Sequence, residues 1–356
     1  MLSFLNILSS SQHLEDGLRL ILIGFGVIGQ SFAKLLLSRS ADLYSLYGTK
    51  PRVVACVDKH GSTVSTTGLD LERLLGIKKS KGSVGAYTEK SSGFDALHII
   101  ENVDAEIVLE LTPTNLDNGE PGMEHIISAM RSGKHVITVN KGPLALAFPS
   151  LLELANYNQV MLRFSGTVGG GTPILEFAKR CLKGDRITSF RGILNGTTNY
   201  ILSKMEEGFP FKIALSDATQ KGYAESDPSL DLNGYDAAAK LVIMANWIMG
   251  MKVTMKDINI TGITGLDVSD IKTAQIKGSA VKLIAACDKI HLDVKPTEVS
   301  KKDPLYVNGT LNAVTFSSEH SGQQTIIGRG AGGIETASAV LRDLIEIRDS
   351  ILEQSD

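Results

Sequence analysis

Short apolar runs alternate with segments of helical periodicity through the first half of the chain. The first run, Leu18–Ile23, ends at a glycine, and apolar residues then recur at helical spacing at Ile28, Phe32, Leu35 and Leu36. Three more strand-like runs follow at Arg52–Val57, Ala105–Leu111 and His135–Val139. The last two flank a helical stretch at Met123–Arg131. Apolar strands separated by helices predict a parallel sheet covered on both faces. We therefore expect residues 1–150 to form a Rossmann-type α/β domain.

The pattern changes after about residue 150, where helical segments come first and strand-like runs follow. The helical segments are Pro173–Leu182, Asn199–Glu206, Phe211–Gln220 and Tyr235–Ile248. The strand-like runs are Val281–Cys287, His291–Val294, Ala313–Phe316 and Thr325–Ile327. This order predicts an α+β domain with a mixed sheet over residues 151–328. We expect residues 329–356 to form a helix that returns to the first domain, and the apolar residues 1–17 to form a leader ahead of the fold.

The charge balance argues against several classes of partner. The 356 residues include 36 lysines and arginines against 39 aspartates and glutamates, which leaves a formal charge of -3. Such a balance provides no broad basic surface for nucleic acid or an acidic membrane.

The longest apolar stretch, Leu241–Met251, is too short to span a membrane. The three cysteines lie far apart without a CxxC pair, which fits a reducing, cytoplasmic location rather than a disulfide framework or zinc site.

A glycine-rich turn follows the first predicted strand and opens the first predicted helix. Its residues are Gly24, Phe25, Gly26, Val27, Ile28 and Gly29, in the pattern GxGxxG. The first glycine permits the tight turn, the second lets a pyrophosphate approach the backbone, and the third allows close helix–strand packing. The N-terminus of the helix offers the phosphates free N–H groups. We expect a dinucleotide, NAD or NADP, at this turn; the alternative is a turn that serves only backbone geometry.

Asp58 ends the second predicted strand, where a carboxylate can accept hydrogen bonds from the ribose hydroxyls of a dinucleotide. Its distance from the glycines is longer than usual, which a loop at Ala41–Pro51 would explain. Asp58 would repel a 2′-phosphate and so favours NAD, whereas the adjacent Lys59 and His60 could attract that phosphate. The sequence leaves NAD and NADP open, and the alternative role for Asp58 is a strand-end cap.

The segment Lys221–Lys240 places four carboxylates in a loop that then enters a helix. Asp236 and Lys240 are four residues apart and so share one helix face. Because the helix continues as an almost wholly apolar run, we expect the charged pair to be buried and satisfied by partners or by a ligand. Several carboxylates beside one lysine suit a substrate that carries an ammonium group. The alternative is structural: Asn233 caps the helix, and Lys240 pairs with Asp236 in solvent.

The run GYAESDPSLDLNGYDAAAK within this segment resembles the signature of the homoserine dehydrogenases. Further segments resemble parts of that family in the same order, so that the resemblance covers the chain from about residue 18 to its end. These segments are Val139–Gly142, Val168–Gly171 with Pro173, Leu194–Ile201, and Gly330–Gly332 with Thr336, Ala337 and Asp343.

This resemblance implies the reversible reduction of L-aspartate 4-semialdehyde to L-homoserine with NADH or NADPH, and it assigns roles by matched position. Lys240 would be the acid/base at the carbonyl oxygen, with Lys141 a second lysine nearby. Glu225, Asp231 and Asp236 would hold the amino group and the reacting hydroxyl. The substrate pocket would be completed by Gly196, Thr197 and Tyr223. The cofactor would be contacted by Thr112, Lys141, Gly222 and Gly332.

Relatives in this family commonly bind a monovalent cation with a glutamate at the position of Ser165. The remaining ligands implied here are the carbonyls of Val168, Gly170 and Thr172, so a sodium site is expected in weakened form. The resemblance also implies a homodimer formed through the second domain, and no segment resembles the regulatory ACT domain of some relatives. Two alternatives stay open: another Rossmann dehydrogenase of an amino-acid-derived carbonyl compound, or a dinucleotide sensor without turnover.

Overall fold

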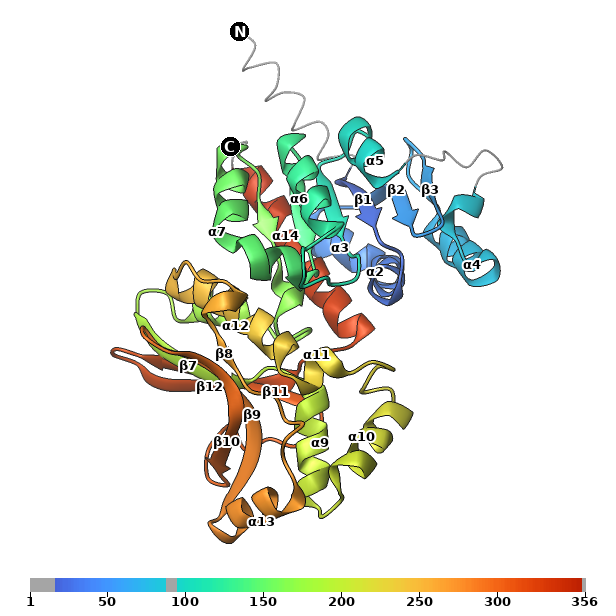
Figure 1. Ribbon diagram of the computed structural model, residues 1–356. Coiled ribbons are helices and arrows are strands. Elements are labelled where there is room, and N and C mark those ends of the chain that lie inside the picture. The colour runs from blue at the N-terminus through green and yellow to red at the C-terminus, as the bar shows by residue number, and fades with distance from the viewer. Residues whose placement is uncertain (1–16, 88–94, 354–356) are drawn as a thin grey trace. The chain divides into compact units, whose positions relative to one another are not determined.

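Sheet A consists of six short strands in the order β3-β2-β1-β4-β5-β6. Figure 1 labels the first three of them, β3, β2 and β1. All neighbours pair in parallel except β3, which runs antiparallel to β2. Nearly every residue of the central strands is buried, as predicted for a parallel sheet covered on both faces. The strands are β1 Arg19–Ile23, β2 Arg52–Asp58, β3 Gly61–Val64, β4 Ile107–Glu110, β5 His135–Thr138 and β6 Leu162–Arg163.

Helices connect these strands. They are α2 Val27–Ser38, α3 Ser40–Tyr47, α4 Leu71–Lys81, α5 Ala96–Asn102, α6 Gly122–Arg131 and α7 Lys141–Tyr157, with 3-10 turns η1 Val84–Tyr87 and η2 Ser165–Thr167. The predicted loop at Ala41–Pro51 is wrong over most of its length, because α3 occupies it. Leu43 buries its side chain in the core, and Gly48 ends the helix in the left-handed conformation.

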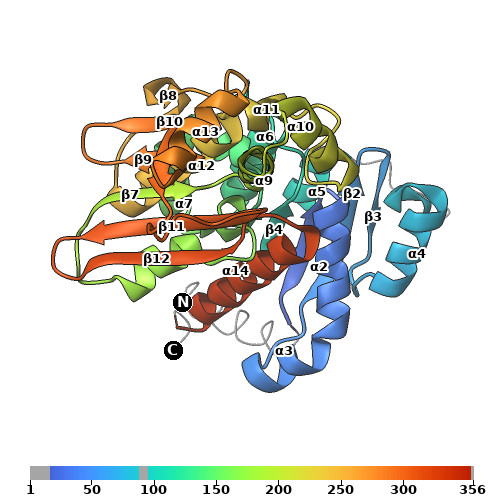
Figure 2. The same ribbon diagram turned by 90° about the horizontal axis from the view of Figure 1, so that it is seen from below.

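The computed structural model describes residues 17–87 and 95–353, so the predicted leader lies outside the described residues except for Gly17. The chain divides into two compact units. The first comprises the residues up to Pro143, Pro149–Thr167, and the residues from Thr336 onward; the second comprises Leu144–Phe148 and Val168–Glu335. The last helix, α14 Gly333–Glu353, starts in the second unit and continues into the first. There its Val340 and Leu344 join the core that also holds Phe32 of α2. Figure 2 shows α14 running beside α2.

The second unit is built on sheet B, with strand order β12-β11-β7-β9-β10-β8. Its neighbours are antiparallel except for β10 and β8, so the sheet is mixed, and the predicted fold class is confirmed. Helices α9, α12 and α13 contact the sheet (Figure 1). The strands are β7 Ile187–Ile193, β8 Asn259–Ile260, β9 Ser279–Cys287, β10 Leu292–Ser300, β11 Leu311–Ser318 and β12 Gly322–Arg329.

The helices of this unit agree with the predicted ones in three of four cases. They are α9 Gly196–Glu206, α10 Phe211–Gln220, α11 Ser229–Leu232, α12 Tyr235–Met249 and α13 Val268–Ile276, with a 3-10 turn η4 at Met255–Asp257. The predicted helix Pro173–Leu182 is instead a short α8, Ile174–Glu176, that continues as a π-helical segment η3, Phe177–Cys181. No helix of the described residues combines the length and hydropathy that crossing a membrane requires.

Phe316 anchors the sheet B core, because its fully buried ring lies 6.0 Å from the rings of both Phe177 and Phe190. We expect Phe316→Ala to lower the free energy of unfolding by about 3–5 kcal/mol through lost burial and the cavity left behind. Ile327→Ala, at a half-exposed position of β12, is the control and should change it by well under half as much. Chemical denaturation measures both variants, and equal losses would contradict this account of the core.

Candidate active site

The glycine-rich turn brings the end of β1 against the end of β4. Gly24 has φ +103°, and a Cβ at this position would lie 2.7 Å from the carbonyl carbon of Leu111. Gly26 is the N-cap of α2 and has open space around it, so a ligand can reach the backbone there. The side chain of Phe25 belongs to the core, whereas Val27 is exposed. Since β1 and β4 flank the reversal of strand order, the turn lies where α/β sheets bind ligands.

A buried carboxylate organises the neighbouring strand ends. Glu110, at the end of β4, accepts hydrogen bonds from the amide and hydroxyl of Thr112 and lies 3.5 Å from Nδ1 of His125. The side-chain Nδ2 of Asn140 donates to Oγ1 of Thr112 at 3.2 Å, and Asn140 is also the N-cap of α7. Lys141 is therefore the first residue of a helix rather than the end of a strand. The first unit thus brings Thr112 and Lys141 near the carboxyl ends of β4 and β5.

Asp58 ends β2 as predicted, but its carboxylate is already engaged. One oxygen accepts from the amide of His60 and the hydroxyl of Ser83, and the other accepts from Lys78 and the amide of Val84. Burial alone would raise the pKa of Asp58, but these hydrogen bonds, that of Lys78 first, lower it below the usual value. The side chain is only 4% exposed, so in this arrangement Asp58 anchors the turn after β2.

Lys240 lies on the buried face of α12 in the second unit and is only 8% exposed. Its Nζ donates to Oδ2 of Asp236, one helical turn earlier, and to the carbonyl oxygen of Leu194, each at 2.7 Å. The predicted pairing on one helix face is present, and it is not a solvent-exposed pair. The structure contradicts the alternative in which Asn233 caps this helix, since the N-cap is Gly234 with φ +85° and makes no side-chain cap.

Asn195 joins the two carboxylates of the site. Its Nδ2 donates to Asp231 at 2.7 Å and to Asp236 at 2.8 Å, while its Oδ1 accepts from the backbone N–H of Thr198 and so caps α9. We assigned no role to this residue from the sequence. An Asn three residues before a Thr at the start of a predicted helix is the signal of an N-cap, but the bridge depends on Asp231 and Asp236, which lie 36 and 41 residues away.

The two carboxylates shape the electrostatics of the site. The pKa of Asp231 is raised, first by burial and then by the negative charge of Asp236; hydrogen bonding to Thr197 and Asn195 and the charge of Lys240 oppose this rise. The site thus holds two carboxylates and one ammonium in a partly desolvated space. A cationic group that entered between the carboxylates would relieve their repulsion.

The other predicted substrate and cofactor residues of the second unit lie in three places. Gly196 begins α9 where a Cβ would lie 2.7 Å from the carbonyl oxygen of Thr310, and Thr197 donates to the carbonyl oxygen of Tyr223 at 2.8 Å. These three residues surround the start of α9. Glu225 and Gly222 are exposed and make no described hydrogen bond to the Lys240 cluster. Gly332 has φ +137° in the turn before α14.

The predicted cation segment is a tight turn in which Gly169 and Gly170 both have positive φ. The carbonyl oxygen of Thr172 accepts a hydrogen bond from the backbone N–H of Ile174 at 2.8 Å. Val168, whose carbonyl is another predicted ligand, is a fully buried residue. Ser165, in the first unit, donates from its amide and hydroxyl to the buried carboxylate of Asp343. Its hydroxyl is therefore committed to a protein carboxylate.

Comparisons with known proteins agree over most of the chain. A family model described as homoserine dehydrogenase matches residues 173–345, and one described as homoserine dehydrogenase, NAD binding domain, matches residues 24–165. The homoserine dehydrogenase of Methanocaldococcus jannaschii is 44% identical over 332 residues, which cover 93% of this chain and 98% of that one. The NAD(+)-dependent homoserine dehydrogenase of Pseudomonas canavaninivorans is 38% identical over 347 residues, covering 95% and 98%.

Solved structures agree with these matches. A hyperthermophilic archaeal homoserine dehydrogenase, solved in complex with NADPH, superposes with a TM-score of 0.81 at 27% sequence identity. The match covers 94% of this chain and 98% of that chain.

Substitutions of Asn195 separate its two roles. Asn195→Ser keeps an N-cap oxygen and loses the amide donor, whereas Asn195→Ala loses both. We therefore expect the free energy of unfolding of the Ala variant to be about 1 kcal/mol lower than that of the Ser variant. Both variants should raise the pKa of Asp231 further, because the amide hydrogen bond lowers it. Carboxyl NMR titration measures the pKa, with exposed Asp227 as the internal control. An unchanged Asp231 titration would disprove the bridge.

Proposed function

The chain belongs to the homoserine dehydrogenase family, and on that premise we propose how its own residues carry out the reaction. It is an NAD(P)-dependent oxidoreductase that acts on a CH–OH group. The reaction interconverts L-homoserine and L-aspartate 4-semialdehyde, a step of threonine and methionine biosynthesis. The observation that carries the mechanism is the buried ammonium of Lys240, fixed by Asp236 and the carbonyl of Leu194.

Lys240 acts as the acid/base. When bound, the nicotinamide supplies a hydride to the carbonyl carbon in the reduction and accepts one in the oxidation. In the reduction, negative charge develops on the carbonyl oxygen, and the Lys240 ammonium stabilises that charge and donates a proton to it. In the oxidation, the neutral amine of Lys240 accepts the proton of the homoserine hydroxyl. Asp236 and the Leu194 carbonyl orient Nζ in both directions, and Lys141 is proposed as a second cation near the same oxygen.

The carboxylates recognise the amino group of the substrate. Asp231 and Asp236 are brought together by one carboxamide, so an ammonium group placed beside them gains two charge-assisted interactions. Glu225 is proposed as a third acidic contact, contributed by the exposed loop before α11. Gly196, Thr197 and Tyr223 close the pocket around the start of α9, where the absent Cβ of Gly196 lets the backbone carbonyl of Thr310 pack against the helix.

The cofactor lies against the turn Gly24–Gly29, with Thr112, Lys141, Gly222 and Gly332 as further proposed contacts. Support for both nucleotides comes from relatives, since the Pseudomonas protein is described as NAD(+)-dependent and the archaeal structure holds NADPH. Asp58 is bound to Lys78, so it can meet a ribose hydroxyl only by exchanging one of its present hydrogen bonds. Comparing the rates with NAD and NADP before and after Asp58→Asn measures the influence of this carboxylate.

A homodimer, a cytoplasmic location and a sodium site complete the proposal. The three cysteines Cys56, Cys181 and Cys287 are all free thiols, which supports a reducing compartment. Gly169 and Gly170, both with positive φ, curl the chain into a tight turn at the proposed sodium site. The dimer is supported by the family alone.

Removal of the Lys240 amine tests the mechanism. We expect Lys240→Met to lower kcat by about 10²- to 10⁴-fold in both directions while leaving the affinity for the cofactor nearly unchanged. Homoserine oxidation by the unmodified chain should accelerate as the pH rises, because the base is the neutral amine. The rate is followed by the absorbance of the reduced cofactor. Lys272→Met, at an exposed position of α13, is the matched control. An active Lys240→Met variant, or a pH-independent oxidation, would refute the assignment.

Protonation of Asp231 is expected to weaken homoserine binding at low pH. Its carboxylate must be ionised to hold an ammonium, and its pKa in the free enzyme is raised by burial and by Asp236. The KM for homoserine should therefore begin to rise, as the pH falls, at a higher pH than an ordinary aspartate would produce. Asp231→Asn should raise KM and remove this step from the profile. Asp227→Asn alters an exposed neighbour whose pKa is lowered, and it should leave both unchanged.

A further inference from the structure

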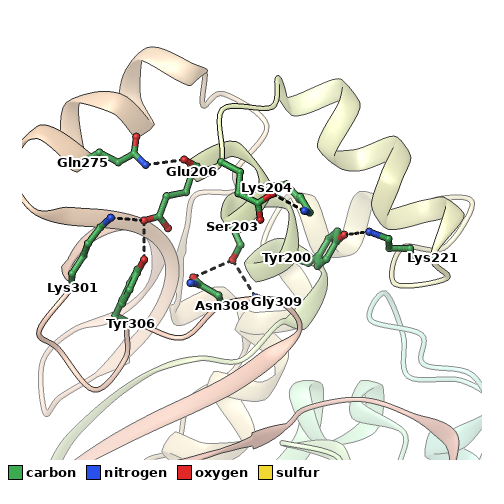
Figure 3. Close-up of a pocket in the computed structure, with 11 residues that line it drawn as sticks. Tyr200, Ser203, Lys204, Glu206, Lys221, Gln275, Lys301, Tyr306, Asn308 and Gly309 are labelled. Carbon is green, nitrogen blue, oxygen red and sulfur yellow. Dashed lines mark hydrogen bonds and ion pairs between the residues drawn. The ribbon is translucent and has the colours of Figure 1, made fainter.

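A cavity of about 580 Å³ lies in the second unit along the C-terminal half of α9 (Figure 3). Helix α9 lines it with Tyr200, Ser203 and Lys204, and the loop between β10 and β11 lines it with Lys301, Tyr306 and Asn308. The volume is that of sites for small molecules. None of the residues proposed for the dehydrogenase reaction lines this cavity.

Lys282 of β9 lies behind this wall and is fully buried, at 0% exposure. Its Nζ donates to Oδ1 of Asn308 at 2.9 Å, to Oδ1 of Asn199 at 3.1 Å and to Ser203 at 3.4 Å. All three acceptors are neutral, and in the described parts of the chain no carboxylate comes within ion-pair distance of this ammonium. Lysines are almost never fully buried without a paired charge, yet the acceptors of Lys282 supply no counter-charge.

The other lysines at the cavity are each paired. Lys301 and the hydroxyl of Tyr306 hold Glu206, Lys204 pairs with Glu207, and Lys221 pairs with Asp217. Burial lowers the pKa of Lys282 to about 8, against the opposing charge of Glu206. That carboxylate is near enough to act on Lys282 but is already neutralised by Lys301. The cavity therefore carries one uncompensated positive charge.

Asn308 connects this charge to the cavity. Because an ammonium can only donate, the carboxamide oxygen of Asn308 faces Lys282, which leaves its Nδ2 group as a donor on the other side. That group has no hydrogen-bond partner among the described residues. A donor polarised by a neighbouring ammonium is a strong anion-binding group.

From this geometry we propose that the cavity binds a small oxyanion, a phosphate or a carboxylate, with Lys282 as its counter-charge and the Asn308 amide as its direct donor. Lys204 and Lys301 also line the cavity, each held in an ion pair with a glutamate. Phosphate and carboxylate would be recognised in the same way, because each has a negatively charged oxygen that can accept a hydrogen bond from the Asn308 amide near the buried ammonium of Lys282. This site is distinct from the dehydrogenase site and its occupancy does not depend on the proposed roles of Lys240 or Asp231.

Isothermal titration calorimetry with inorganic phosphate and, separately, with malonate tests the proposal. The full chain is first saturated with NAD, so that the cofactor fills the phosphate-binding turn at Gly24–Gly29. We expect one of the two anions to bind, and Lys282→Met to weaken its binding by about 10- to 100-fold, the range for losing a nearby opposite charge in a partly buried site. The anion that binds more tightly identifies the class of ligand. Lys277→Met, an exposed lysine paired with Glu298, should leave the affinity unchanged.

A second variant keeps the test independent of folding. Asn308→Ala retains the buried lysine and removes the direct donor, so it should weaken the same anion even if Lys282→Met fails to fold. Failure of both anions to bind the unmodified chain would overturn the proposal. So would equal affinity in the Asn308→Ala variant. In either case Lys282 would serve only to hold the loop at Tyr306–Asn308 onto α9.

Discussion

The buried ion pair between Lys240 and Asp236 is the interaction on which the catalytic half of the molecule depends. Removing two charges from water costs several kcal/mol per ion, and their attraction offsets this only when their remaining hydrogen-bonding positions are also satisfied. Here the carbonyl of Leu194 accepts a second hydrogen bond from the ammonium, and the side-chain amide of Asn195 donates to the carboxylate. Residues 194 and 195 lead directly into α9, so the same two positions fix the pair and set the direction of that helix.

The first unit, which holds the proposed nucleotide site, depends on a different constraint: two backbone segments pack in direct contact. Gly24 and Leu111 come so close that no side chain fits between them, and the strand ends are then held by the buried carboxylate of Glu110. Thr112 and Asn140 extend this network toward the start of α7. The first unit thus offers N–H groups and small side chains, and the second offers charges. This division matches the chemistry of a phosphate-bearing cofactor and an ammonium-bearing substrate.

Local signals in the sequence predicted much of this arrangement. The bounds of α10 and the start of α12 follow from apolar periodicity, and the glycine turn and the Lys240–Asp236 spacing are each contained in a few consecutive residues. Features that join distant segments were not predictable in the same way. Lys78 reaches Asp58 across 20 residues, and Asn195 reaches Asp231 across 36. The two-residue strand β6 is too short to carry any periodicity, and α3 contains too few buried residues to stand out from a loop.

Asn195 illustrates a consequence for how such an enzyme can change. Its one side chain caps the N-terminus of α9 and also bridges Asp231 and Asp236. Selection for a different substrate charge at this site therefore acts on the stability of α9 at the same time. Aspartate would preserve the cap but add a third negative charge beside the other two, and serine would preserve the cap but leave the acids unseparated. Evolutionary paths to new substrates are therefore expected to begin at the exposed loop around Glu225, where a replacement disturbs no helix.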